Sequence, residues 1–289
     1  MKATLPLGGR CPLAWWGAAI ALTALACQVA CVAPSPTPVP TPSLTPAPVS
    51  VRLAGDTSMY PLAQAFISAY CAAEPGTHCV LDESRSRDGL AEVRAGQADV
   101  GLVARGLDAA ALAREGLSAI PIALDGLVVV VHRDNPAQAL SMEQLRRLYA
   151  GRVFNWSTVG GVDREVQPVT REEGADARQV FDAQVLQGEP LTLHAIALPT
   201  DEAVAEYVAN HPEAIGYVAL NGLRQGVKGI LLQDIPPDDA SIRAGSYPLT
   251  RPMYLVIRGE ASEAVKGLVG YAVGAEGQRI VSGHHVALY

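Results

Sequence analysis

From residue 51 onward, short apolar runs alternate with amphipathic stretches along the chain. Strands are expected at Val51–Gly55, Val80–Asp82 and Val100–Val103, and helices between them at about Pro61–Tyr70 and Leu90–Ala95. A polar or glycine-bearing turn follows each of these strands. This β-α-β-α-β order predicts an open α/β sheet, in which ligands bind at the carboxyl ends of the strands.

The second part of the pattern begins with an unbroken apolar run, Leu127–Val131. Such a run predicts a strand that is buried on both faces. Ser141 is expected to cap a helix that runs through Tyr149, because its hydroxyl can accept from a free N–H of the first turn. Further strands are expected at Ala214–Val218 and Met253–Ile257, and a further helix at Ser262–Val273.

The most informative stretch for function joins a predicted strand, Val166–Thr170, to a predicted helix, Ala175–Leu186, through Arg171 and a turn at Gly174. The first N–H groups of a helix lack backbone partners and carry the positive end of its dipole, so they can bind an oxyanion. Arg171 would add a forked, permanently charged donor without contributing much to the core. An ordinary strand-to-helix turn with a solvated arginine is the alternative that these residues leave open.

The N-terminus has the pattern of a secretory signal. Lys2 and Arg10 precede an apolar run at Leu13–Ala26, which is shorter than a membrane span of roughly 20 residues. The junction before Cys27 resembles a bacterial lipoprotein box, so residues 1–26 are expected to be removed and Cys27 to carry the lipid. Cys31 is a poorer candidate, and a plain signal peptide with a released product is the alternative.

A proline-rich segment follows, and residues 27–50 are expected to be a tether. From Ala33 to Pro48 the chain alternates proline with small residues, which favours extended polyproline II. Removing residues 1–26, whose charges are Lys2 and Arg10, changes the formal net charge from −7 to −9. An acidic domain without a basic stripe is a poor nucleic-acid binder, so an anion would have to be held by a local pocket of donors.

Two cysteines flank a short turn. Cys71 and Cys79 stand on either side of Glu74-Pro75-Gly76, and in an exported protein they are expected to form a disulfide. A metal pair that includes His78 is the alternative, but no second ligand pair has the spacing of a zinc site. Neither a metal nor a cofactor is therefore expected.

Seven segments resemble, in order, landmarks of the bacterial periplasmic phosphate-binding proteins (PstS-like), the receptors of phosphate importers of the ATP-binding-cassette (ABC) class. They are Gly55–Leu62, Gly89–Leu90 with Ala98–Gly101, Leu145–Gly151 with Asn155–Gly161, Arg171–Gly174, Ile215–Tyr217, Tyr247–Pro252 and Glu276–Gln278. The resemblance covers roughly residues 51–289. It implies an α/β, two-lobed periplasmic-binding-protein fold of type II with two crossing hinge strands. Lobe 1 would comprise 51–126 plus 253–289 and lobe 2 would comprise 127–252, with crossings at Leu127–Val131 and Met253–Ile257.

The same resemblance implies a set of ligand contacts. The expected ligand-binding residues are Thr57, Ser58, Met59 through its amide, Ser86, Arg87, Ala104, Arg105, Arg171, Gly174, Ala175, Asp176 and Ala177. Family members commonly have hydroxyl residues where this chain has Ala104, Ala175 and Ala177, so up to three side-chain donors are missing. Each lost charge-assisted bond would remove roughly 1.5–3 kcal/mol of binding free energy.

Charged residues in the same loops could replace these donors. Arg85, Arg87 and Arg105 could supply guanidinium N–H groups, and Asp56, Asp88 or Asp176 could accept the hydrogen of a protonated phosphate. The alternative is that all six are solvated loop charges.

The resemblance implies an extracytoplasmic solute-binding lipoprotein for phosphate or a related oxyanion. It would be a monomer, anchored to the cell membrane by its lipid, and its partners would be an ABC permease and ATPase. A receptor or sensor whose ligand has changed to an organic phosphate, another oxyanion or an acidic metabolite is the first alternative. An exported hydrolase is the second, but the chain has no G-x-S-x-G or H-E-x-x-H motif, and His284-His285 is expected to be structural or exposed. We therefore do not expect an enzyme.

Overall fold

The computed structural model describes residues 49–288 apart from residue 75 and residues 84–87. The signal segment, Cys27 and most of the expected tether lie outside these residues, as do Arg85, Ser86 and Arg87. The described residues belong to one unit of the chain, Pro46–Tyr289. Among them, no helix is both long and apolar enough to cross a membrane.

A mixed sheet organises these residues, and its first part has the strand order β2-β1-β3-β11-β4. The strands are β1 (Val49–Gly55), β2 (Thr77–Leu81), β3 (Val100–Val103), β4 (Leu117–His132), β11 (Thr250–Arg258) and the short β12 (Val286–Ala287). The helices are α1 (Tyr60–Phe66), which continues as a π-helix (Ile67–Cys71), α2 (Gly89–Arg94), α3 (Ala109–Arg114), α8 (Glu263–Val273) and α9 (Ala275–Val281). Strands β2, β1 and β3 are parallel, whereas β11 is antiparallel to both β3 and β4.

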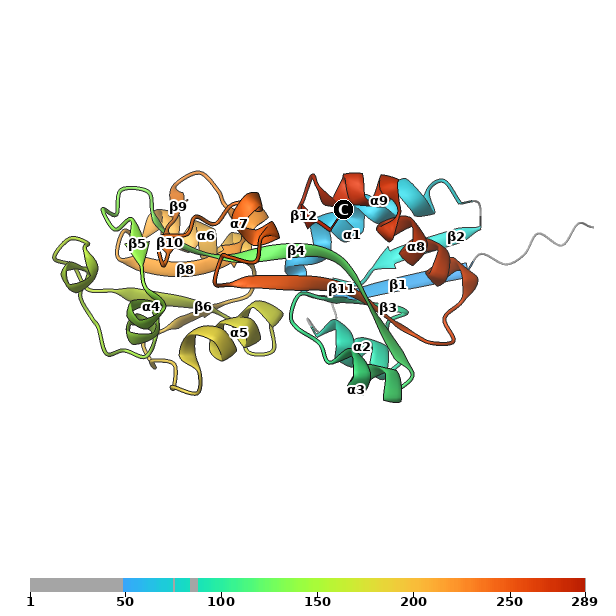
Figure 1. Cartoon of the computed structure of the whole chain (residues 1–289), viewed down its shortest axis with the longest axis horizontal. Coiled ribbons are helices and arrows are strands. Elements are labelled where there is room, and N and C mark those ends of the chain that lie inside the picture. Colours follow the sequence, from blue (N-terminus) through green and yellow to red (C-terminus); the bar gives the residue numbers. More distant parts are fainter. Residues whose placement is uncertain (1–48, 75, 84–87, 289) are drawn as a thin grey trace, which may run out of the picture. The chain divides into compact units, whose positions relative to one another are not determined.

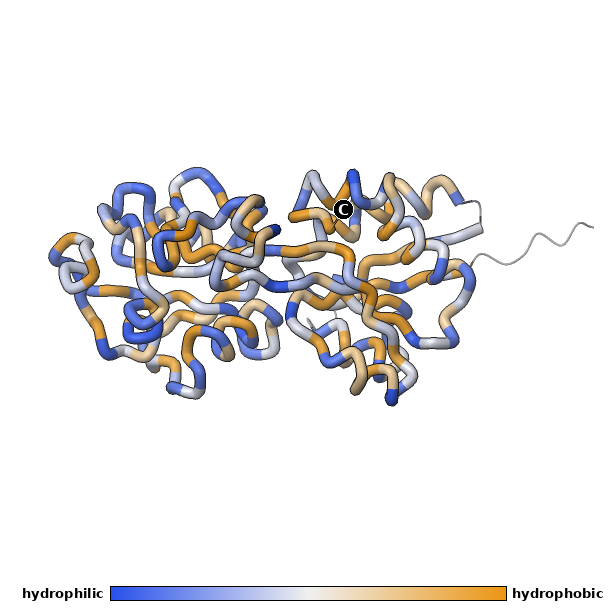
Figure 2. The backbone as a smooth tube through the Cα atoms, in the orientation of Figure 1, coloured by the Kyte–Doolittle hydropathy of each residue, from blue (hydrophilic) through white to orange (hydrophobic). Residues whose placement is uncertain are grey.

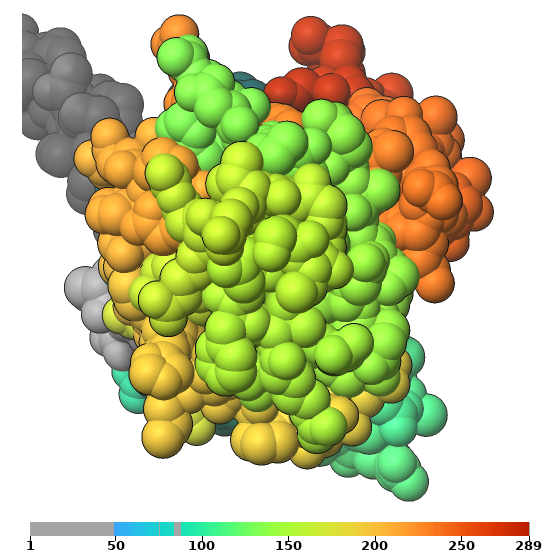
Figure 3. All heavy atoms as spheres, turned by 90° about the vertical axis from the view of Figure 1, so that its left-hand side faces the viewer, coloured from blue at the N-terminus to red at the C-terminus, as the bar shows by residue number. Residues whose placement is uncertain are grey.

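The second part of the sheet continues from β4 through β8 and β6 to β7. Its strands are β6 (Gln167–Arg171), β7 (Ile196–Leu198), β8 (Ala214–Ala219) and β9 (Val227–Gly229), beside a small pair formed by β5 (Ala139–Leu140) and β10 (Leu231–Leu232). Its helices are α4 (Met142–Tyr149), α5 (Asp176–Phe181), which continues as a π-helix (Asp182–Leu186), α6 (Asp201–Asn210) and α7 (Asp239–Arg243). Figure 3 shows this part end-on, with its green and yellow segments toward the viewer.

The buried apolar residues form separate clusters in two halves of the described residues, and β4 contributes to clusters in both halves. We refer to residues 49–123 and 253–288 as the first half, and to residues 127–249 as the second half. Two clusters draw on the first half, around Phe66 and around Val93, and two lie mainly in the second, around Tyr149 and around Val204. Figure 2 shows the apolar segments along the inner strands of both halves.

The local sequence signals account for most of these elements. Strand β3 has the expected bounds, and the expected helix at Pro61–Tyr70 is confirmed as α1 and its π-helical continuation. Ser141 caps α4 in a capping box with Gln144, since each side chain accepts from the other residue's backbone N–H. Cys71 and Cys79 form a disulfide between the end of that π-helix and β2.

Two long strands, β4 and β11, run side by side from one half to the other (Figure 1). The expected crossings at Leu127–Val131 and Met253–Ile257 belong to these strands but are both wrong in position, because the first segment pairs with β8 inside the second half and the second pairs with β3 inside the first half. The crossing lies beside them, where Gly126 and Asp125 face Thr250 and Arg251. A run buried on both faces has the same apolar pattern in a sheet interior as in a crossing strand, which explains the misplacement.

Gly55 ends β1 at a point where the backbone of the first half is tightly packed. A Cβ added there would overlap the carbonyl oxygen of Leu102 and the Cα of Gly89, and the residue has a φ of +142°. The chain can therefore leave β1 and enter the next loop only with glycine at this position.

We expect Gly55→Ala to lower the free energy of unfolding by at least about 2 kcal/mol, because rigid backbone must move to admit the methyl group. The matched control is Gly270→Ala in α8, where a Cβ would meet no described atom within 4 Å and helix propensity should add up to about 1 kcal/mol. Urea denaturation of both variants measures the difference. Equal stability of the two variants would show that the close approach at Gly55 is not a constraint.

Candidate functional site

Buried charges gather where β4 and β11 cross between the halves. The fully or almost fully buried members are Asp56, Asp125, Arg171, Asp176, Asp201 and Arg251, and the partly buried Arg105 joins them. Four of them follow the carboxyl ends of strands: Asp56 after β1, Arg105 after β3, Arg171 at the end of β6 and Asp201 after β7. The other three belong to the crossing strands or to the start of α5. The carboxyl-end edge of the sheet, where an α/β fold is expected to bind its ligand, is therefore occupied by buried charged side chains, which we call the buried layer.

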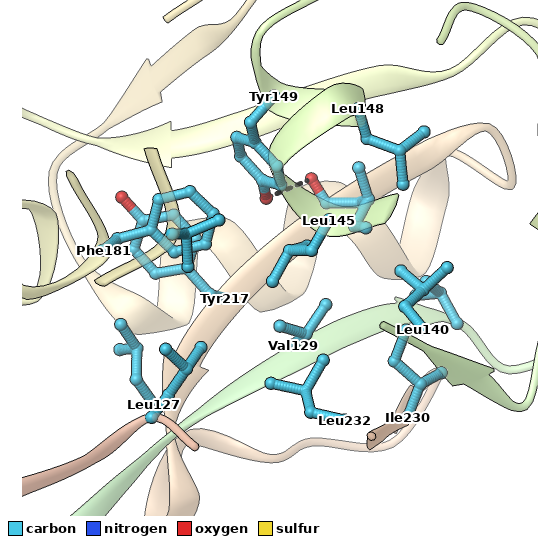
Figure 4. Close-up of a cluster of buried hydrophobic side chains, with 14 of the residues drawn as sticks. Leu127, Val129, Leu140, Leu145, Leu148, Tyr149, Phe181, Tyr217, Ile230 and Leu232 are labelled. Carbon is cyan, nitrogen blue, oxygen red and sulfur yellow. Dashed lines mark hydrogen bonds between the residues drawn. The ribbon is translucent and has the colours of Figure 1, made fainter. Parts of the chain in front are cut away.

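An aromatic cluster in the core of the second half fixes the end of β6 at Arg171. The rings of Tyr149, Phe181 and Tyr217 pack together in this cluster (Figure 4). The Tyr217 hydroxyl lies 2.6 Å from Thr170 Oγ1 and accepts from the Arg171 backbone N–H at 3.3 Å. Burial raises the pKa of Tyr217 to about 12, so this hydroxyl stays neutral and fixes the end of β6.

The Arg171 guanidinium joins both halves and is fully buried. Its Nη1 pairs with Asp201 Oδ1, and its Nη2 donates to Pro199 O at 2.9 Å and, across the halves, to Thr57 Oγ1 at 3.0 Å. No described group accepts from its Nε. Asp201 also accepts from the Ala219 N–H at 2.8 Å. Burial raises the pKa of Asp201, and the positive charge of Arg171 offsets only part of this effect.

Arg251 and Asp125 are directly paired residues on the crossing strands. The arginine donates to Asp125 Oδ2 from Nε at 2.9 Å and from Nη2 at 2.7 Å. Nη2 also donates to Ser58 Oγ at 3.0 Å, and Nη1 donates to Ala104 O at 3.3 Å. Burial alone would raise the pKa of Asp125, but Arg251 and the nearby His285 lower it to about 2.

Asp56 caps the short 3₁₀ helix Thr57–Met59. Its Oδ1 accepts from the Ser58 N–H at 3.0 Å and from the Ser58 hydroxyl, while no described group donates to Oδ2. The residue is 1% exposed. A buried carboxylate oxygen is thus left with free acceptor capacity beside Arg251's partner Ser58.

Asp176 starts α5 and reaches across to the first half. Its Oδ2 accepts from the Ala104 N–H at 2.6 Å, and its Oδ1 accepts from Arg105 Nε at 2.8 Å. Its side chain is fully buried, and Arg105 also lies 3.5 Å from Asp88. Burial and the neighbouring charge of Asp56 raise the pKa of Asp176 to about 7, although Ala104 and Arg105 act in the opposite direction.

The structure brings together part of the expected ligand-binding set. Thr57, Ser58, Ala104, Arg105, Arg171 and Asp176 all take part in this layer. The Met59 and Ala175 amides, expected as free donors, are instead bonded to Asp56 O at 3.1 Å and Glu172 O at 3.3 Å. Ala177 packs in the core of the second half, and Gly174 makes an exposed turn with a φ of +88°.

Three central residues were absent from the expected set: Asp125, Asp201 and Arg251. Each belongs to an apolar stretch or begins a helix, so each could have been taken for a surface charge. The available signal was a charge within each of two mainly apolar strands: Asp125 in β4, and Arg251 in β11, whose other charge is the terminal Arg258. An isolated charge in such a run requires a buried partner.

Two hollows adjoin Thr57. A cavity of about 30 Å³ between the halves is lined by Thr57, Ser58 and Asp201, among others. Beside it, a wider pocket of about 420 Å³ is lined by Thr57, Gln64, Thr200 and other residues. The inner cavity has room for about one water molecule, whereas the outer pocket could hold a small organic group.

Comparison with known proteins points to one group. A family model described as a PBP superfamily domain matches residues 41–276. The phosphate-binding protein PstS of Bacillus subtilis is 25% identical over 229 residues, which cover 77% of this chain and 74% of that protein. A Clostridium perfringens protein assigned as a phosphate ABC transporter substrate-binding protein, and solved with bound phosphate, is 26% identical with a TM-score of 0.77; the match covers 83% of this chain and 99% of that one. An ABC-type phosphate transport receptor from Vibrio cholerae shares the fold at 23% identity and a TM-score of 0.69, over 81% of this chain and 98% of that one.

We expect Arg171→Ala to destabilise the protein by about 3–5 kcal/mol at pH 8, because Asp201 would be left charged and buried. This corrects the expectation that Arg171 contributes little to the core. Without Arg171, the pKa of Asp201 in the folded state would rise still further above its unfolded value. The loss of stability should therefore shrink as the pH falls toward 4, because protonation of Asp201 stabilises the folded variant. Chemical denaturation across this pH range measures it.

The control is Arg94→Ala, which removes a half-exposed pair with Glu115 and should change the stability little at any pH, because solvent screens the pair. A pH-independent loss in Arg171→Ala, or one no larger than that in the control, would contradict the assigned role of the buried pair.

Proposed function

This chain belongs to the PBP superfamily, and we propose that it is an extracytoplasmic solute-binding protein for phosphate or a related oxyanion. Family membership confirms the expected α/β fold and the resemblance to PstS-like proteins. In the proposal a lipid on Cys27 holds the protein at the cell membrane, and an ABC permease with its ATPase receives the ligand. The relatives are a phosphate-binding protein and a phosphate ABC transporter substrate-binding protein, which supports this assignment.

The main support for the proposal is the buried Nε of Arg171. The Nη1 and Nη2 groups of this guanidinium are bonded, but its buried Nε–H has no described acceptor, which is costly, and an oxyanion at the junction of the halves would satisfy it. Thr57 already approaches the same guanidinium from the other half. The free Oδ2 of Asp56 is a matching acceptor for the hydrogen of a protonated phosphate.

The proposed mechanism is closure of two lobes around the ligand. The lobes would be residues 51–126 plus 253–289 and residues 127–252, connected by β4 and β11. Contacts across the junction, such as Arg171 with Thr57 and Asp176 with Ala104, would break on opening. The Arg251–Asp125 pair lies on the crossing strands themselves and would persist, so it would serve as the fixed base of the motion.

A receptor with a changed ligand is the second candidate. The side chains of Ala104, Ala175 and Ala177 offer no donors, which weakens the case for a tight inorganic phosphate site. The pocket of about 420 Å³ beside Thr57 could hold the organic part of a phosphate ester or an acidic metabolite. An exported hydrolase has less support, because His285 is buried beside Asp125 at the crossing.

We expect the mature protein to bind phosphate, sulfate or a small phosphate ester at pH 6. This pH lies below the pKa of about 7 of Asp176, so most of this carboxyl group is neutral and does not repel an anion. A ligand at 100 times its Kd should stabilise by about 2.7 kcal/mol in a thermal-shift panel. Arg171→Lys keeps a charge beside Asp201 but loses the fork, so calorimetry should show at least a tenfold weaker affinity for the selected anion.

The control is Arg146→Lys, a half-buried arginine of α4 that bonds to Glu143 and to the Val185 carbonyl, away from the junction. It should bind as the wild type does. If Arg171→Lys binds equally well, the anion site is not at Arg171. If no anion of the panel stabilises the wild type, the proposed function fails.

A further inference from the structure

The Asp176 side chain already occupies donors that an oxyanion between the halves would need. Its two carboxylate oxygens accept from the Ala104 N–H and from Arg105 Nε, both of which belong to the first half. The side chain itself comes from the second half, at the start of α5, and is fully buried. A negatively charged group of the protein thus bridges the halves as a bound anion would.

We propose that Asp176 is an internal competitor of the ligand, a carboxylate that holds Ala104 N–H and Arg105 until an oxyanion displaces it or a proton neutralises it. The inference rests on the proposed function, since it concerns the same site. It assigns Asp176 a role opposite to that of a ligand contact.

The donor inventory supports competition. The side chain of Ala104 has no donor, so its N–H is what this position offers, and that N–H is bonded to Asp176 at 2.6 Å. Arg105 lies between two carboxylates, 2.8 Å from Asp176 and 3.5 Å from Asp88. An incoming anion must therefore take over donors that a carboxylate already holds.

The charge balance of the site leads to the same conclusion. Among the described residues of the buried layer, each arginine has a carboxylate partner: Arg105 has Asp176, Arg171 has Asp201 and Arg251 has Asp125. Asp56 adds a fourth carboxylate. A dianion placed beside an ionised Asp176 would meet a like charge in a poorly solvated site, which disfavours binding.

The competition should weaken as the pH falls. Burial and Asp56 raise the pKa of Asp176 to about 7, so near this pH the carboxyl group begins to take up a proton and lose its charge. The charged or titratable groups of the buried layer and its immediate ion-pair partners are unchanged by a substitution at Asp176. They are Asp56 after β1, Asp88 at the start of α2, Arg105 after β3, Arg171, Arg178 and Asp182 on β6, α5 and its continuation, Asp201 on α6, and Arg251, Asp125 and His285 at the crossing. A comparison of wild type with Asp176→Asn isolates Asp176, because all the others are unchanged in both proteins.

The test is calorimetric binding of sulfate and phosphate to the mature protein at pH 6.0 and pH 8.5. Sulfate is used because it carries no proton in this range and does not itself titrate. If the neutral form of Asp176 admits the anion, the sulfate affinity of the wild type should fall about 30-fold from pH 6.0 to pH 8.5. Asp176→Asn should vary little with pH and should bind sulfate at least tenfold more tightly than the wild type at pH 8.5.

The matched control is Asp134→Asn, which removes one negative charge from an exposed loop residue and should follow the wild type. Circular dichroism checks that each variant is folded. If Asp176→Asn does not fold, the pH profile of the wild type still decides, and a flat sulfate profile overturns the inference.

The outcomes separate the inference from the function on which it rests. Weaker phosphate binding by Asp176→Asn would make Asp176 an acceptor for the ligand's hydrogen and would overturn the competitor role. Equal binding by the wild type and Asp176→Asn at both pH values would also overturn it, while the proposed function would stand. Absence of binding of either anion to either protein would refute the proposed function itself.

Discussion

The Arg251–Asp125 ion pair is the interaction on which the rest of the site depends. The two residues face each other on β11 and β4, the strands that connect the halves, and both are fully buried. A shift of one residue in the pairing of these strands would leave both charges buried without partners, so the pair fixes the register. From it, hydrogen bonds extend to Ser58, Ala104 and Leu220, which places the loops that form the junction.

In a site built this way every described arginine already has a carboxylate partner before any ligand arrives, and Asp56 adds a fourth carboxylate to the layer. Arg171 and Arg105 are paired with carboxylates just as Arg251 is, and the formal net charge of the chain is −7. Selectivity must therefore come from a local exchange of partners and not from a positive field. The Asp176 carboxylate is the member best placed for such an exchange, because its two bonds cross from one half to the other.

Local sequence patterns predicted the elements but only part of the site. Strand β3, the capped helix α4 and the strand-to-helix turn at Arg171 follow from short-range signals of periodicity and capping. Arg251 and Asp125 are 126 positions apart, and Asp176 and Ala104 are 72 apart, so their contacts depend on topology that no local pattern specifies. The resemblance supplied the order of the loops, but it could not show that Asp176 turns inward to bond Ala104 and Arg105.

A crystal structure of the protein grown with sulfate at pH 6 would show whether an anion takes over the donors that Asp176 holds. Sulfate oxygens are expected within hydrogen-bonding distance of the Ala104 N–H, Arg105 and Arg171 Nε, with the Asp176 carboxylate displaced from the first two and Arg251 still paired with Asp125. A sulfate bound elsewhere, with Asp176 still accepting from Ala104 and Arg105, would contradict this exchange of partners.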